Sequence, residues 1–217
     1  MKVFESFRDP QGKVVLTESE VWRLVATGET ARLDEFLDLK LTSRWQHDGS
    51  LIAATRASRE EAESFRQNFA AHAFAAAAAG KDFQLFKHRR AEFPSYPFEW
   101  APEMLSDAAL LTLDAAETFF AETGWSLKDA TPFNILFEGP KPVFIDILSF
   151  EKRDPKDPLW LPYNQFAQTF LLPLLLNKEA GLPLQTIFTT NRDGLPVAEA
   201  AKFLGGGLLK KLKPEIL

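Results

Sequence analysis

The chain contains no cysteine among its 217 residues. Disulfide bonds, thiolate metal sites and a cysteine nucleophile are therefore excluded, because each of them needs a thiol. The first residues, Met1-Lys2-Val3-Phe4-Glu5, do not begin the apolar stretch of a secretory signal peptide. We expect a chain with neither disulfides nor a signal peptide in the cytoplasm, where thiols stay reduced.

Long hydrophobic runs and an excess of positive charge are also missing. The longest apolar run covers residues 170–176, contains Pro173 and is far shorter than the ~20 residues that a membrane span requires. Lysine and arginine total 25 against 30 aspartate and glutamate residues, which gives a net charge of -5. A negative chain repels a polyanion, so we expect neither a membrane segment nor a nucleic-acid partner.

A glycine-rich phosphate-binding loop cannot be found in the sequence. The glycines of the N-terminal part are isolated, and no Gly-x-Gly-x-x-Gly pattern includes Gly12, Gly28, Gly49 or Gly80. The glycine cluster at residues 205–207 follows an expected helix and has too few residues behind it for a nucleotide-binding domain. Binding of S-adenosylmethionine (SAM) would therefore need a separate domain.

The N-terminal part of the chain has the pattern of a small sheet. Hydrophobic residues make up 46% of the chain and charged residues 25%, which is typical of a folded protein. Short apolar runs between turn residues predict strands near 3–7, 14–16, 21–25, 51–54 and 83–87. Helical spacing of apolar and alanine residues predicts helices near 29–40 and 58–79.

The C-terminal part is predicted to be mainly helical. The clearest helix runs from Pro102 to Thr123, because Pro102 suits a first turn and Gly124 suits the position just past the end. Two apolar runs at 135–137 and 143–145 predict a hairpin. Further helical segments are expected at 162–177 and, more weakly, at 184–188 and 197–204.

Three polar residues stand out in the segment between these elements. Asp129 and Asn134 follow the long helix in an expected loop, and Asp146 comes at the end of the second strand of the hairpin. In kinases a loop aspartate accepts the proton of the substrate hydroxyl, while an asparagine and a later aspartate hold Mg²⁺. Mg²⁺ prefers oxygen ligands, which these side chains supply. We therefore expect the three side chains to converge.

The segment LKDATPFNILFEGPKPVFIDILSF, residues 127–150, resembles the catalytic loop and metal-binding strand of the protein-kinase-like superfamily. The form is the plainer one of aminoglycoside and choline kinases: KDATPFN stands where these have His-x-Asp followed by Asn, and FIDI stands where they have Asp-Phe-Gly. Together with FPSYPFEWAPEMLSDAALLTL and YNQFAQTFLLPLLL, it is similar to the kinase-like N-terminal region of bacterial proteins called class I SAM-dependent methyltransferases.

This resemblance implies a protein-kinase-like α+β fold. It places a small β-rich lobe at residues 1–92 and a larger, mainly helical lobe at 93–217. It implies Asp129 as the catalytic residue, Asn134 and Asp146 as ligands of Mg²⁺, and Lys128 with those two as ATP-binding residues. A partner methyltransferase domain, in the same chain or another, would supply SAM.

The sequence also departs from the kinase pattern, and two functions stay open. Leu127 replaces the catalytic-loop histidine, no glycine follows Asp146, and no clear strand lysine with a helix glutamate is found, since Lys87 lies too near the hinge and Lys13 and Arg56 are only substitutes. One hypothesis is a noncatalytic kinase-fold module that positions a substrate or partner for a methyltransferase. The other is an active Mg-ATP-dependent phosphotransferase; the short segment after Asp146 favours a small or nonprotein acceptor.

The same candidate residues also have structural interpretations. Asp129 before Ala-Thr-Pro is good turn chemistry, and an asparagine such as Asn134 often holds a loop together through backbone hydrogen bonds. A carboxylate after an apolar strand needs a partner, which for Asp146 would be a metal ion or Lys128. Tyr96, Phe98 and Trp100 would either stack an adenine ring or pack a hinge against the long helix.

Overall fold

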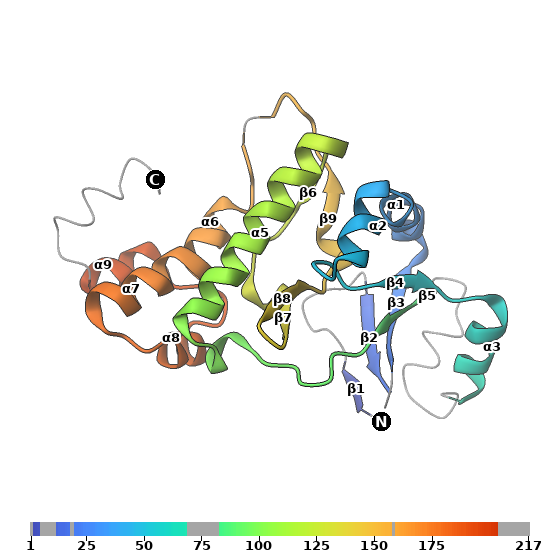
Figure 1. Ribbon diagram of the computed structural model, residues 1–217, viewed down its shortest axis with the longest axis horizontal. Helices are drawn as coiled ribbons and strands as arrows, with labels where there is room; N and C mark the ends of the chain where they lie inside the picture. The colour runs from blue at the N-terminus through green and yellow to red at the C-terminus, as the bar shows by residue number, and fades with distance from the viewer. Residues whose placement is uncertain (1, 5–11, 18–19, 69–82, 158, 204–217) are drawn as a thin grey trace. The chain divides into compact units, whose positions relative to one another are not determined.

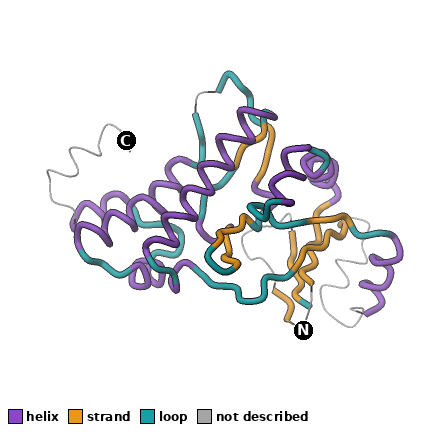
Figure 2. Tube along the Cα trace, in the orientation of Figure 1, coloured by secondary structure: helices purple, strands orange, loops and turns teal. Residues whose placement is uncertain are grey.

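The computed structural model describes residues 2–4, 12–17, 20–68, 83–157 and 159–203 (Figure 1). The chain divides into two compact units, Met1–Arg90 and Ala91–Leu217. The first unit is built on a sheet and the second is mainly helical (Figure 2). The predicted α+β class, with a small β-rich part followed by a larger helical part, is confirmed.

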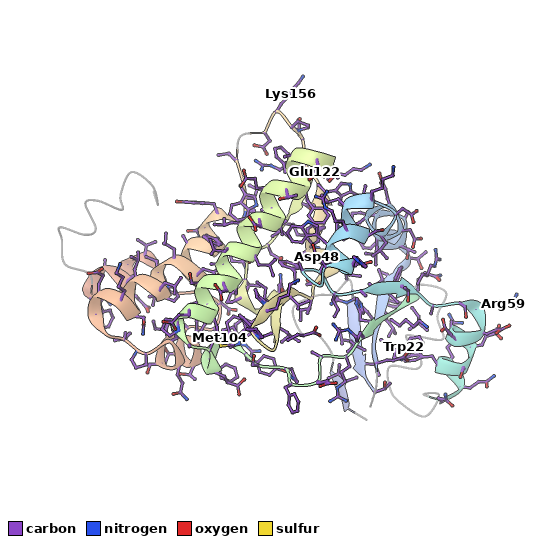
Figure 3. The ribbon with its side chains drawn as sticks, in the orientation of Figure 1. Trp22, Asp48, Arg59, Met104, Glu122 and Lys156 are labelled. Atoms are coloured by element: carbon purple, nitrogen blue, oxygen red, sulfur yellow. The ribbon has the colours of Figure 1, made fainter. Side chains whose placement is uncertain are left out.

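The first unit is an antiparallel sheet in the strand order β1-β2-β3-β5-β4. Its strands are β1 (Lys2–Phe4), β2 (Gly12–Leu16), β3 (Glu20–Ala26), β4 (Ala54–Arg56) and β5 (Phe83–Arg89). Trp22, labelled in Figure 3, packs on Phe65 of helix α3 (Arg59–Asn68) with ring centroids 4.9 Å apart. This contact buries one face of the sheet together with Val15, Leu24 and Leu85.

Two expectations for the first unit are wrong in detail. The helix predicted at 29–40 is two helices, α1 (Thr27–Leu37) and α2 (Lys40–His47), because Leu39 adopts an extended conformation between them. The strand predicted at 51–54 begins only at Ala54, although Leu51 and Ile52 are buried as the apolar pattern requires. Of the helix predicted at 58–79, residues 69–79 lie outside the described residues.

The second unit is organised by the long helix α5 (Pro102–Thr123), whose two ends are marked by Met104 and Glu122 in Figure 3. Its predicted bounds are confirmed, with Pro102 in the first turn and Gly124 in the left-handed conformation at φ 75°. Strand β6 (Trp125–Leu127) follows and pairs with β9 (Phe150–Lys152). The predicted hairpin is also confirmed, as β7 (Ile135–Glu138) and β8 (Lys141–Phe144).

Three short 3₁₀ turns connect these elements: η1 (Pro97–Glu99), η2 (Pro132–Asn134) and η3 (Ile147–Ser149). The helical segment predicted at 162–177 consists of α6 (Tyr163–Phe166), the π-helix η4 (Ala167–Leu171) and α7 (Leu172–Ala180). Pro173 lacks the N–H that would continue the usual i to i−4 ladder, which favours a wider turn before it. Helices α8 (Leu184–Thr190) and α9 (Val197–Phe203) complete the described part.

The core of the second unit is aromatic. Phe150 lies between Phe119 of α5 and Phe144 of β8, with ring centroids 4.7 Å and 5.4 Å away. All three rings are buried, so they fix the end of β8 and the start of β9 against the long helix. None of the helices in the described part of the chain is both long and apolar enough to cross a membrane.

Candidate functional site

Two strand pairings bring the polar segment of residues 127–150 together. Leu127 lies opposite Phe150 in the pairing of β6 with β9, and the Lys128 N–H continues it by donating to the carbonyl of Ser149 at 2.8 Å. In the hairpin, the Ile145 N–H donates to the Asn134 carbonyl at 2.8 Å, one step beyond the last strand pair. The loop that carries Asp129 and Asn134 is therefore joined at both ends to the turn that carries Asp146.

The side chains of Asp129, Asn134 and Asp146 form one hydrogen-bonded cluster with Ser149. The Asn134 Nδ2 group donates to Asp129 Oδ1 at 2.9 Å and to Ser149 Oγ at 3.0 Å. The Ser149 hydroxyl donates to Asp146 Oδ2 at 2.8 Å, and the Leu148 N–H donates to Asp146 Oδ1 at 3.3 Å. The structure thus brings together all three residues that were expected to converge, although their catalytic and metal-binding roles stay predictions.

Asp129 has an altered acidity in this cluster. Its burial raises the pKa of the carboxyl group above the ordinary value, and the neighbouring Asp146 charge acts in the same direction. The neighbouring Ser149 hydroxyl, the positive charge of Lys128 and the hydrogen bond from Asn134 oppose this rise in pKa. Lys128, the remaining predicted site residue, thus acts on Asp129 through its positive charge, which lowers the pKa of the Asp129 carboxyl group.

Helix α6 and the π-helix hold the loop from the other side. The residue after Asp129, Ala130, is fully buried, and its N–H donates to Gln165 Oε1 at 2.7 Å. The Ala130 carbonyl accepts from the Thr169 hydroxyl at 3.0 Å. Both backbone groups of Ala130 are thus bonded by side chains of one helical segment, so the backbone beside Asp129 has little freedom to shift.

Sequence reasoning missed Ser149, Gln165 and Thr169 as parts of this site. Ser149 belongs to no motif of the sequence, and Gln165 and Thr169 lie 35 and 39 positions from Ala130. A single sequence carries no signal for a polar contact at that separation.

The aromatic stretch before α5 has a structural role, because Trp100 is buried and packs edge-on against Phe137 with ring centroids 5.0 Å apart.

Two of the three cationic residues considered in the first unit have acidic partners. Lys87 of β5 forms an ion pair with Glu61 of α3, so a strand lysine with a helix glutamate does occur. Arg56 of β4 pairs with Asp34 of α1 at 2.6 Å on the surface. The side chain of Lys13 lies outside the described part of the chain.

The cluster in the second unit suits a hard cation by its donor chemistry. Asp129, Asn134 and Asp146 offer carboxylate and amide oxygens, which are the ligands that Mg²⁺ prefers, and no sulfur or imidazole. No group of three or more His, Cys, Asp or Glu side chains in the described ranges could hold a metal ion. Mg²⁺ does not need such a group, since it is usually bound by one or two carboxylates, water and substrate phosphates.

Comparison with known proteins gives one relative by sequence. The chain is 31% identical over 205 residues to nodulation protein NoeA of Rhizobium meliloti (strain 1021), a match that covers 94% of this chain. It covers 39% of NoeA, so the chain spans well under half of that relative's length. No family model matches the chain.

Comparison with solved structures gives the Legionella pneumophila Lpg2603 kinase bound to IP6. The TM-score is 0.43 and the sequence identity 12%, over 96% of this chain and 73% of that chain.

Proposed function

We propose that the second unit carries a Mg²⁺-dependent nucleotide-binding site of the phosphotransferase type. The observation that supports the proposal is the convergence of Asp129, Asn134 and Asp146 in one hydrogen-bonded cluster. Helix, loop with Asp and Asn, hairpin and second Asp follow one another along the chain as in kinase-type sites. Three separated residues of the right types in this order are a more specific signal than any of them alone.

Each residue has a role in this proposal. Asp129 would accept the proton of the acceptor hydroxyl, and the raised pKa caused by its burial makes its carboxylate a stronger base. Asn134 and Asp146 would hold Mg²⁺, which when bound neutralises charge on the nucleotide phosphates. Lys128 would face a phosphate as a point charge. Gln165 and Thr169 would keep the loop in place through Ala130.

The proposed acceptor is a small or nonprotein molecule. Between Asp146 and helix α6, which begins at Tyr163, the described residues form one 3₁₀ turn, the short strand β9 and turns. Kinases that act on proteins use a longer activation loop in this part of the chain. A short segment leaves less surface for an extended peptide.

Isothermal titration with Mg²⁺–ATP tests this proposal. We expect the wild-type chain to bind, and Asp146→Ala to lose binding while it keeps its circular dichroism spectrum. Asp154→Ala is the matched control, because Asp154 is an exposed residue of the same unit whose carboxylate accepts from the Lys156 N–H within its own turn. Wild-type protein that shows no heat of binding would refute the proposed site.

A second candidate is a noncatalytic module that positions a substrate or partner for a SAM-dependent methyltransferase. The internal hydrogen bonds of the cluster favour it, since Asn134 and Ser149 also serve to hold the loop in shape without any ligand. The larger part of NoeA lies outside the matched region, which leaves room there for another domain.

The two candidates differ in what Asp129 does. We expect a folded Asp129→Ala variant to leave methylation by a co-purified methyltransferase domain intact if the unit is a module. Loss of phosphoryl transfer to a small hydroxyl acceptor in the same variant would instead support the phosphotransferase. Capture of a SAM-binding domain by the immobilised chain is the necessary first result for the module.

A further inference from the structure

The hydroxyl group of Ser149 lies at the centre of the cluster and has no place in the predicted chemistry. Ser149 is fully buried, at 0% exposure, and its oxygen contacts the Asn134 amide at 3.0 Å and the Asp146 carboxylate at 2.8 Å. The same Asn134 amide bonds Asp129 Oδ1 at 2.9 Å. One hydroxyl group thus contacts two residues of the proposed site directly and is linked to the third, Asp129, through Asn134.

The number of protons fixes the direction of these bonds. A serine hydroxyl has a single proton, and a carboxylate can only accept. When Ser149 donates its proton to Asp146, it must accept from Asn134, and only the NH₂ end of the amide can donate. The 2.9 Å contact of the same Nδ2 atom with Asp129 Oδ1 agrees, because an amide oxygen there would face another acceptor.

The orientation of the Asn134 amide has a consequence for metal binding. Both N–H bonds of the NH₂ group are used, one toward Asp129 and one toward Ser149. The amide oxygen Oδ1, which is the atom that Mg²⁺ would bind, is then directed away from these two partners. With the amide reversed, its NH₂ group would face the ion and repel it.

Ser149 also fixes the carboxylate of Asp146. Asp146 caps the turn η3, where its Oδ1 accepts from the Leu148 N–H and its Oδ2 from the Ser149 hydroxyl. A carboxylate has about four acceptor positions in total, and these two bonds take one position on each oxygen. The bond from Ser149 therefore fixes the orientation of the carboxylate relative to the turn η3.

We propose that Ser149 is a positioning residue that orients the Asn134 amide and the Asp146 carboxylate toward a divalent cation. This inference rests on the proposed function. Ser149 would not contact the ion itself, but binding of the cation would depend on it. Groups behind metal ligands typically change metal affinity by about 10- to 100-fold when they are removed.

The experiment combines Mg²⁺–ATP titration with NMR of the Asn134 side chain in the full chain. The variants are Ser149→Ala, which removes the hydroxyl, and Ser149→Thr, which keeps it. Ser126→Ala is the matched control, because Ser126 is also a buried serine of this unit, at 2% exposure, and lies in β6 outside the cluster. The Asn134 NH₂ signals are identified by their loss in Asn134→Asp.

We expect Ser149→Ala to weaken Mg²⁺–ATP binding by about 10- to 100-fold, while Ser149→Thr restores most of it and Ser126→Ala binds like wild type. In the metal-free wild type, the Asn134 NH₂ protons should exchange with water more slowly than those of the exposed Asn164. This protection should be lost in Ser149→Ala. A role in packing alone would leave the amide signals and the affinity unchanged.

Three outcomes overturn the inference, and they can be told apart. If wild type binds Mg²⁺–ATP and Ser149→Ala binds equally tightly, the role of Ser149 is wrong and the proposed function stands. If wild type does not bind, the proposed function fails and the inference fails with it. Equally fast exchange at Asn134 and Asn164 in the wild type also overturns it, whether or not any variant folds.

Discussion

Replacement of Thr169 by valine tests whether the π-helix holds the loop beside Asp129. Thr169 is buried, at 1% exposure, and its single hydroxyl proton is shared between two carbonyls, that of Gln165 at 2.8 Å within the helix and that of Ala130 at 3.0 Å in the loop. Valine keeps the branched shape of threonine and removes the donor. The substitution therefore leaves the Ala130 carbonyl without its side-chain partner.

The size of the effect follows from the burial of Ala130. A buried acceptor that loses its hydrogen-bond partner costs about 1–3 kcal/mol, whereas water replaces a lost bond at the surface. Ala130 has 0% exposure, so water has no direct access to its carbonyl. We expect Thr169→Val to lower the free energy of unfolding by about 1–3 kcal/mol.

Thr189→Val is the matched control for this measurement. The Thr189 hydroxyl donates to the carbonyl four residues earlier, that of Gln185, at 2.8 Å, as Thr169 does within its own helix, but on the exposed surface. Its substitution should change stability by no more than about 0.5 kcal/mol, as is usual at the surface. The difference between the two variants isolates the contribution of the bond to Ala130.

The assay is urea unfolding followed by tryptophan fluorescence, since Trp100, Trp125 and Trp160 lie in the second unit. The transition midpoint should fall in Thr169→Val with an unchanged dependence on urea concentration, which separates a stability change from a change in compactness. If Thr169→Val and Thr189→Val differ by less than about 0.5 kcal/mol, the bond to Ala130 does not anchor the loop.

Three further predictions concern charge and backbone. Because burial raises the pKa of Asp129, ionisation of this group should cost stability as the pH rises from its ordinary value of 3.8 through the raised value. Asp129→Asn should therefore gain stability over wild type across that range in denaturation at stepped pH. The hydrogen bond from Lys87 lowers the pKa of Glu61, so Lys87→Met should lose a small, salt-sensitive stabilisation that is present above pH 4.5 and disappears as the pH falls through the lowered value. Gly194 has φ 113°, and a Cβ there would lie 3.1 Å from Thr169 Cγ2, so Gly194→Ala should lower the thermal midpoint through strain of about 1–3 kcal/mol.

Each of these predictions has a distinct contrary result. A stability difference between Asp129→Asn and wild type that does not vary with pH would contradict the raised pKa of Asp129. If Lys87→Met has the same acid transition as wild type, the ion pair contributes nothing. Gly181→Ala is the control for Gly194→Ala, because Gly181 has φ 65° and open space around it; equal losses would mean that the contact with the π-helix is unimportant.

The sequence alone was sufficient for the elements whose signals are local. The bounds of helix α5 follow from the spacing of its apolar residues, from Pro102 in the first turn and from Gly124 just past the end. The hairpin of β7 and β8 was equally predictable, because two apolar runs flank a turn. Asp129, Asn134 and Asp146 were identified as candidates because their residue types and order match a known chemistry.

The tertiary structure decided everything that depends on contacts between distant residues. The break at Leu39 that divides the predicted helix, and the pairing of the short strands β6 and β9, have no strong local signal. The anchoring of Ala130 by Gln165 and Thr169 joins residues 35 and 39 positions apart. Spacing along a chain gives the direction of side chains only within one element, so contacts across elements, including the central place of Ser149, appear only when the chain is folded.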